Sequence, residues 1–104
     1  MEFKELQNKI TLALARYGSD NGIRVDDEYV LVKLFEEMGD IAKTALIYKN
    51  KCENRKMIPR DEAKKMIAVE IADTVGLLLA FASQLNIDVE EEIKDKWLSK
   101  YAEA

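Results

Sequence analysis

Residues 69–82 read VEIADTVGLLLAFA, a stretch that is apolar except for two charged side chains, Glu70 and Asp73. A helix that is apolar on nearly all sides is normally buried in its own fold or in an interface. Carboxylates in such surroundings are costly unless they pair with an opposite charge or coordinate a metal ion. Because Glu70 and Asp73 are three residues apart, they lie on one face of a helix. The stretch therefore predicts a core helix that turns two carboxylates toward a common partner.

A second acidic group, EEMGD at residues 36–40, repeats the three-residue spacing with Glu37 and Asp40. Two such pairs facing each other across two helices predict a cation site built from oxygen ligands alone. Such ligands, without histidine or thiolate, favour Mg²⁺, with Mn²⁺ as the alternative ion. The competing interpretation is a set of surface acids paired with lysines, such as Glu37 with Lys33 four residues earlier.

Composition and charge indicate one water-soluble helical domain that spans residues 1–104. Charged residues make up 35% of the chain, which contains one proline and four glycines. The net charge of −4 argues against a nucleic-acid partner, because such proteins usually carry a basic excess. No segment approaches about 18 uninterrupted apolar residues, so we expect no membrane partner.

The chain begins MEFKELQNKI, which lacks the apolar core of a signal peptide, and we expect a cytoplasmic protein. Its single cysteine, Cys52, cannot form an internal disulfide, as is typical of a reducing compartment. The sequence contains no histidine. That absence excludes serine–histidine and cysteine–histidine catalysis, and it removes the usual ligands of zinc and of non-haem iron.

Apolar periodicity predicts an all-α, four-helix bundle-like chain. The first helix is expected over residues 3–17, with Gly18 as its stop and residues 19–22 as a loop. The second is expected over about 26–52, capped by Asp26 or Asp27, and the third over about 60–85. Asp88 with Glu91 predicts the capped start of a fourth helix.

The spacing of apolar residues also predicts which helix faces form the core. The stripe of the second helix contains Leu31, Leu34, Met38, Ile41, Ala45 and Tyr48, and that of the third contains Ile67, Ile71, Val75, Leu78 and Ala82. Other apolar residues of the third helix lie on its further faces. Together they form more apolar surface than the four helices of one chain can cover. We therefore expect a homodimer or a dimer of dimers.

Basic side chains gather in two places. Residues 49–65 include seven basic residues against three acids, and the last predicted helix carries further lysines. Such a patch in an acidic protein can attract a polyphosphate. Ordinary solvated charges are the alternative interpretation. The candidate phosphate-binding residues are Arg55, Lys56, Arg60, Lys96 and Lys100.

These parts together favour hydrolysis of a phosphoric anhydride. Metal ions neutralise phosphate charge, lower the pKa of bound water and hold attacking and leaving oxygens in line. Since the chain offers no evident nucleophile of its own, we expect water to attack.

The motifs at residues 36–40 (EEMGD) and 70–73 (EIAD) resemble the EExxE…ExxD signature of MazG-type nucleotide pyrophosphohydrolases, of the all-α NTP pyrophosphatase superfamily. The similarity extends from about Leu31 to Tyr101. It implies a helical dimer or dimer of dimers that cleaves nucleoside triphosphates between the α and β phosphates with Mg²⁺. It also implies that Glu37, Asp40, Glu70 and Asp73 bind metal and that Glu36 is a supporting or water-orienting catalytic acid.

Two features depart from the family pattern. Asp40 stands where the family usually has glutamate, so its carboxylate is one methylene shorter, and 29 residues separate it from Glu70. Enzymes of the same superfamily that act on phosphoribosyl-ATP or dUTP use the same acids, so these compounds are alternative substrates. A non-catalytic helical interaction module with a decayed acidic site is the alternative from another class. A di-iron carboxylate protein is disfavoured because its Glu-x-x-His ligands are missing.

Overall fold

The structure is a computed structural model that describes residues 1–101, and these residues are helical with no β-strand among them. The elements in chain order are α1 (Phe3–Asn21), α2 (Asp27–Tyr48), the 3₁₀ turn η1 (Asn54–Lys56), α3 (Arg60–Gln84), α4 (Val89–Ile93), the π-helical turn η2 (Lys94–Leu98) and α5 (Ser99–Tyr101). The predicted all-α class is confirmed. The predicted fourth helix is present as the consecutive elements α4, η2 and α5.

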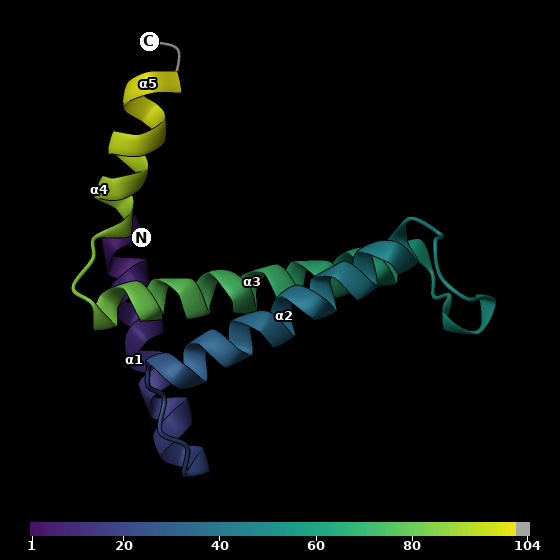
Figure 1. Ribbon diagram of the computed structural model, residues 1–104, viewed down its shortest axis with the longest axis horizontal. Coiled ribbons are helices and arrows are strands. Elements are labelled where there is room, and N and C mark those ends of the chain that lie inside the picture. Colours follow the sequence, from purple (N-terminus) through teal and green to yellow (C-terminus); the bar gives the residue numbers. More distant parts are fainter. Residues whose placement is uncertain (102–104) are drawn as a thin grey trace.

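Helices α2 and α3 form a long antiparallel hairpin, and η1 lies in the connection at its far end (Figure 1). Helix α1 crosses α3 at the opposite end, where α2 begins and α3 finishes (Figure 1). The C-terminal segment α4–α5 projects from that same end. The resulting shape is thin, with extents of 47 × 45 × 24 Å, and much helix surface stays uncovered.

Two helix starts follow the predicted capping pattern. The Asp26 carboxylate accepts a hydrogen bond from the Tyr29 amide at 3.0 Å and begins α2. The Asp88 carboxylate accepts one from the Glu91 amide at 3.1 Å and begins α4. Each carboxylate satisfies an amide that has no partner within the first turn of its helix.

Two helix ends differ from the sequence prediction. Helix α1 continues through Gly18 and stops only at Gly22, which adopts a left-handed conformation with φ of 65°. Gly18 is buried, and a Cβ placed there would lie 2.5 Å from Cγ2 of Val25. Its role is therefore close packing and not termination. Helix α2 ends at Tyr48, before residue 52, and Asn50 turns the chain with φ of 57°.

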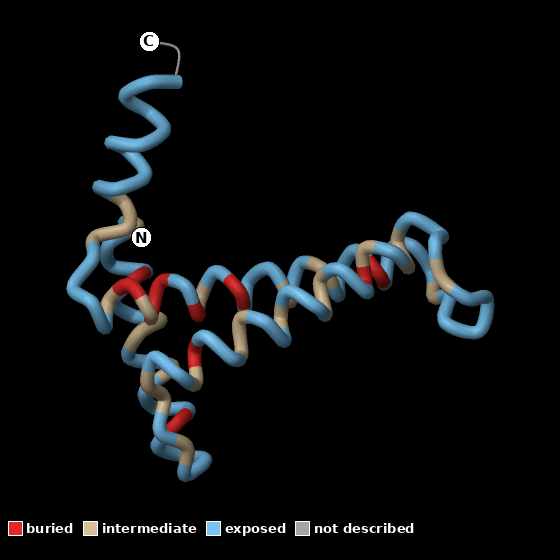
Figure 2. Tube along the Cα trace, in the orientation of Figure 1, coloured by how far each residue is buried: buried red, intermediate tan, exposed pale blue. Residues whose placement is uncertain are grey.

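The buried residues gather on α3 and at the two ends of the hairpin (Figure 2). The buried apolar side chains are Val30, Ala63, Leu77, Leu79, Ala80 and Ala82. The predicted stripes are therefore partly wrong within one chain, because α2 meets α3 through the face that carries Val30 and Thr44. Five members of those stripes remain between 45% and 55% exposed: Leu31, Met38, Ile71, Val75 and Leu78.

Helix α3 is long and apolar enough to cross a membrane by length and composition alone. Its most apolar 18-residue window has a mean hydropathy of 1.8, yet only 28% of that window is buried inside the chain. Glu70 and Asp73 interrupt this helix, and α1 and α2 both pack against it. A core helix shared with a second chain has the same composition.

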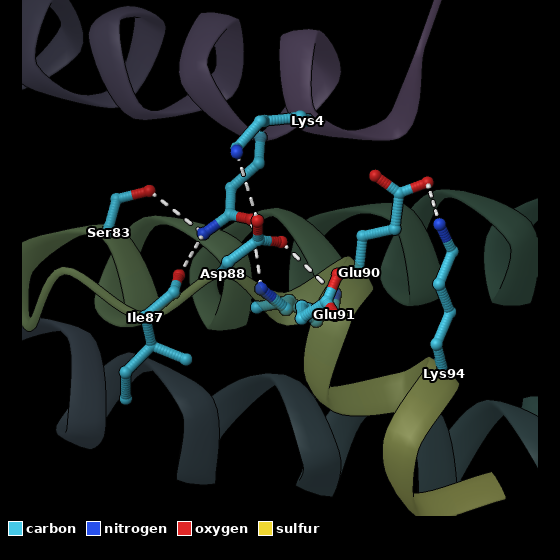
Figure 3. A network of polar contacts seen from close by, with 9 residues as sticks. Lys4, Ser83, Ile87, Asp88, Glu90, Glu91 and Lys94 are labelled. Carbon is cyan, nitrogen blue, oxygen red and sulfur yellow. Dashed lines mark hydrogen bonds and ion pairs between the residues drawn. The ribbon is translucent and has the colours of Figure 1, made fainter. Parts of the chain in front are cut away.

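A polar network joins α1 to the start of the C-terminal segment (Figure 3). The side chain of Gln7, only 4% exposed, donates to the Ile87 carbonyl at 2.9 Å and to Ser83 Oγ at 3.1 Å. Its Oε1 accepts from the Val89 amide at 3.3 Å. Lys4 and Asp88 add an ion pair at 3.1 Å. This network fixes where the chain turns out of α3 into α4.

We expect Gln7→Met to lower the free energy of unfolding by about 2 kcal/mol, because buried polar groups that lose their partner cost about 1–3 kcal/mol. The measurement is urea unfolding at one fixed protein concentration. Asn8→Met, at the exposed neighbouring position, is the matched control and should change stability by less than about 0.5 kcal/mol. Equal effects of the two substitutions would contradict the role given to Gln7.

Candidate functional site

Three of the predicted site residues lie together on one turn of α2. Glu36, Glu37 and Asp40 can each offer one carboxylate oxygen, and these three atoms lie within 4.8 Å of one another. Glu36 is exposed, whereas Glu37 and Asp40 are partly buried. The three residues could hold a metal ion, although clusters of acids on one helix also occur without one.

The two candidate acids of α3, Glu70 and Asp73, lie on consecutive turns of the helix. Glu70 Oε2 accepts a hydrogen bond from Thr44 Oγ1 of α2 at 3.1 Å. Asp73 lies one turn further along α3 and lines the same pocket as Glu37. The structure therefore brings Asp73 to the same pocket as Glu37 and sets Glu70 against Thr44. Among the described residues, the acids that lie within 4.8 Å of one another are Glu36, Glu37 and Asp40, and neither Glu70 nor Asp73 belongs to that group.

The electrostatics of Glu37 reflect this crowding. Partial burial raises the pKa of the Glu37 carboxyl above its ordinary value, and the charges of Asp73 and Asp40 raise that pKa further. Lys33 acts in the opposite direction but does not reverse the shift. Acids that repel one another in this way favour a cation among them.

A pocket of about 390 Å³ opens beside Glu37 and Asp73. Helix α1 supplies an apolar wall that includes Ile10 and Leu14, and Tyr17, Tyr29 and Lys33 complete the lining. Burial raises the pKa of Tyr29, and the neighbouring Tyr17 raises it further. Small-molecule sites are typically such concave apolar pockets with a few polar groups at the edge.

Sequence reasoning missed three residues of this lining, Tyr17, Tyr29 and Lys33. Tyr29, Lys33 and Glu37 follow one another at four-residue intervals on α2, and this spacing was an available signal. Lys33 forms its ion pair with Glu36 at 3.0 Å, whereas the sequence suggested Glu37 as its partner. That hydrogen bond raises the pKa of Lys33, which stays a cation at neutral pH.

None of the five predicted phosphate-binding residues lines the pocket. Arg55 pairs with Glu53 at 2.7 Å, and the Arg60 guanidinium lies 4.4 Å from the centre of the Tyr48 ring. Lys56 lines a separate groove near η1. The eight helical steps from Asp40 to Tyr48 already span about 12 Å. One chain therefore keeps this basic end apart from the acids.

Lys96 and Lys100, the other two candidate phosphate-binding residues, lie at the other end of the molecule. Lys96 belongs to η2 and lines an apolar hollow with Ile93 and Trp97, and Lys100 belongs to α5 (Figure 1). Trp97 and Tyr101 contact each other with ring centroids 5.8 Å apart and ring planes tilted by 46°, and both are more than half exposed. Within one chain these lysines do not reach the acids either.

A comparison with protein families, curated proteins and solved structures finds no match to this chain. The resemblance to MazG-type enzymes therefore rests on the two acidic motifs and stays a prediction.

The donor set fits a hard divalent cation. Every candidate ligand is a carboxylate oxygen, the kind of ligand that Mg²⁺ and Mn²⁺ take in proteins. Glu70 Oε1 is buried and has no hydrogen-bond partner among the described residues, so this oxygen has capacity for an ion. The crowded carboxyl of Glu37 would be relieved by the same positive charge.

The raised pKa of Glu37 predicts that Glu37→Gln stabilises the protein by an amount that depends on pH. The folded protein binds more protons at Glu37 than the unfolded chain does, so stability falls as pH rises from the ordinary glutamate range through the raised pKa. Without divalent metal, the substitution should raise the melting temperature at pH 7. The gain should shrink toward zero near pH 4.

Asp88 serves as a control of opposite sign. Hydrogen bonds from the Glu91 amide and from Lys4 lower the pKa of the Asp88 carboxyl, so its stabilisation is present at neutral pH and is lost on acidification. Asp88→Asn should therefore lower the melting temperature at pH 7 and have less effect at acidic pH. Parallel pH profiles for the two variants would contradict the electrostatics described for Glu37.

Proposed function

We propose that the protein is a Mg²⁺-dependent nucleoside triphosphate pyrophosphohydrolase that cleaves between the α and β phosphates, with Mn²⁺ as an alternative ion. The observation that carries the proposal is the meeting of acids from α2 and α3 at the rim of one pocket. Glu37 and Asp73 line that pocket, Asp40 offers an oxygen within 4.8 Å of one from Glu37, and Glu70 lies one turn before Asp73 on α3. The resemblance of both acidic motifs to MazG-type enzymes supports the same activity.

The pocket supports a nucleotide in preference to inorganic pyrophosphate. Its volume of about 390 Å³ lies within the usual range for small-molecule sites, and its far wall is apolar. Tyr17 and Tyr29 offer aromatic surface, on which a base can stack. Lys33 lines the same pocket, one turn from Tyr29 and one turn from Glu37 on α2, and it can meet a phosphate or a base acceptor there. A substrate with an aromatic end and a polyanionic end fits such a pocket.

The proposed reaction uses water as the nucleophile. Water attacks phosphorus, the bond from the α phosphorus to the bridging oxygen breaks, and pyrophosphate leaves with that oxygen. Bound metal supplies charge neutralisation on the phosphates and a lowered pKa of water. Glu37, Asp40, Glu70 and Asp73 would hold the metal. We assign Glu36, which is exposed and hydrogen-bonded to Lys33, the role of orienting water and accepting its proton.

The first experiment is a panel of ribo- and deoxynucleoside triphosphates, phosphoribosyl-ATP and dUTP, assayed with Mg²⁺ for pyrophosphate and for orthophosphate. We expect pyrophosphate together with a nucleoside monophosphate, and no release without divalent metal. Orthophosphate as the main product would contradict cleavage between α and β. No product from any substrate would favour the non-catalytic interaction module.

The second experiment uses Glu70→Gln. The amide keeps the shape of the side chain and an acceptor for Thr44, but it removes a negative charge. We expect an unchanged or higher melting temperature without metal, because repulsion among the acids falls. We also expect a smaller rise in melting temperature with Mg²⁺. Hydrolysis should fall by about 100-fold or more, since losing groups that only orient metal ligands already costs 10–100-fold.

Glu62→Gln is the matched control for that experiment. Glu62 is an exposed glutamate in the first turn of the same helix, remote from the pocket. Its substitution should leave the Mg²⁺ response and the activity near those of the parent. A Glu70→Gln protein that is less stable without metal, yet responds fully to Mg²⁺ and stays active, would mean that Glu70 is part of a structural contact.

We also propose that a second copy covers the apolar flank of the hairpin, which we define as Leu31 and Met38 of α2 with Ile71, Val75 and Leu78 of α3. All five side chains are about half exposed in one chain. Met38 is two residues from Asp40, and Ile71 is two residues from Asp73. Residues two apart point nearly opposite ways on a helix, so the flank faces away from the acids.

The assembly proposal predicts a homodimer or a dimer of dimers at micromolar concentration. Ile71→Lys, on the apolar flank, should shift the sedimentation equilibrium toward monomer, because burying a lysine in an apolar interface is costly. Leu12→Lys, at a 71% exposed position on α1, is the control and should leave the mass unchanged. A well-folded parent monomer at that concentration would show that no second copy covers the flank.

A further inference from the structure

Thr44 lies outside both acidic motifs but contacts one of their residues. It belongs to α2, one turn beyond Asp40, and its exposed fraction is 0%. Its hydroxyl donates to Glu70 Oε2 across the helix interface at 3.1 Å. A buried hydroxyl needs a partner, and this one has taken a carboxylate oxygen of the neighbouring helix.

The two carboxylate oxygens of Glu70 have different surroundings. Oε2 is occupied by the Thr44 hydroxyl, whereas Oε1 is buried without a hydrogen-bond partner among the described residues. A buried carboxylate oxygen with no donor is costly, and a cation would remove that cost. The hydrogen bond to Oε2 also limits rotation of the carboxylate, so the orientation of Oε1 depends on Thr44.

We infer that Thr44 is a positioning residue that holds Glu70 Oε2 and thereby presents Oε1 to the divalent cation. The inference rests on the proposed function, because it takes Glu70 to be a metal ligand. Groups that orient a metal-ligating side chain typically contribute 10–100-fold to metal affinity or activity. A threonine suits this position, since one short hydroxyl supplies the donor and its methyl group packs in the interface.

Thr74 of α3 provides a matched control, because its hydroxyl also bonds Glu70 but at a different atom. It is also a buried threonine, 8% exposed, and its hydroxyl donates to Glu70 at 2.8 Å. That bond goes to the backbone carbonyl of Glu70 on the same helix, and it does not touch the carboxylate. Thr74→Val therefore removes a buried hydroxyl without freeing Oε2.

The experiment measures Mn²⁺ binding alone, by titration calorimetry or by loss of the free-ion EPR signal. Thr44→Val keeps the shape but removes the donor, and it should weaken Mn²⁺ binding about tenfold or more. Thr44→Ser keeps the donor and should stay within a few-fold of the parent. Thr74→Val should also stay within a few-fold. In the pyrophosphate assay, Thr44→Val should need more metal for half-saturation and recover most of kcat when metal is saturating.

The possible failures are distinct. A parent that binds no Mn²⁺ overturns the proposed metal site together with this inference. A parent that binds Mn²⁺, with Thr44→Val binding equally tightly, overturns the role of Thr44 and leaves the metal site standing. If Thr44→Val and Thr74→Val weaken Mn²⁺ binding equally, both hydroxyls have a structural role only, and the positioning role of Thr44 is overturned. Should Thr44→Val not fold, Thr44→Ala removes the same donor and is judged by the same outcomes.

Discussion

The packing of α3 is the constraint on which the rest of this structure depends. The helix is apolar on several sides, and one chain provides only two helices to cover it, α2 along one face and α1 across another. Both contacts leave the flank with Ile71, Val75 and Leu78 half exposed. One chain therefore leaves part of the apolar surface of α3 in contact with water.

The two carboxylates within α3 explain why this helix is not covered evenly. The carboxylates of Glu70 and Asp73 require water, a hydrogen-bond donor or positive charge. Asp73 lines the pocket, and Glu70 meets the Thr44 hydroxyl of α2. Met38 and Ile71 lie two residues from Asp40 and Asp73, on the opposite side of their helices. Helical periodicity thus places the acids and the half-exposed apolar side chains on different sides of their helices.

The C-terminal segment is attached through polar contacts instead of a broad apolar interface. Gln7 bonds the backbone at Ile87 and Val89, and Lys4 pairs with Asp88, so the direction of the segment is well defined (Figure 3). Beyond that anchor, Trp97 and Tyr101 stay more than half exposed. Lys96 and Lys100 of the segment are therefore held away from the acids of α2 and α3 in their own chain.

Local interactions explain what could be read from the sequence. The all-α class, the caps at Asp26 and Asp88, and the pairing of acidic spacings depend on residues within about one helical turn of each other. The helical faces that turn inward were predicted less well, because Val30 and Thr44, and not Leu31 and Met38, meet α3. Amphipathic periodicity identifies apolar faces but does not distinguish contact within a chain from contact between chains.

Contacts between distant residues required the tertiary structure. The crossing of α1 over α3 brings Tyr17 to Tyr29 and Lys33 beside the acids, although no local pattern links the first helix to the second. The buried hydrogen bond from Thr44 to Glu70 spans 26 residues, and only the packing of α2 on α3 creates it. Sequence alone determined which residues carry the charge. The tertiary structure decided which charges meet, because helix crossing and burial set the distances through which charges act.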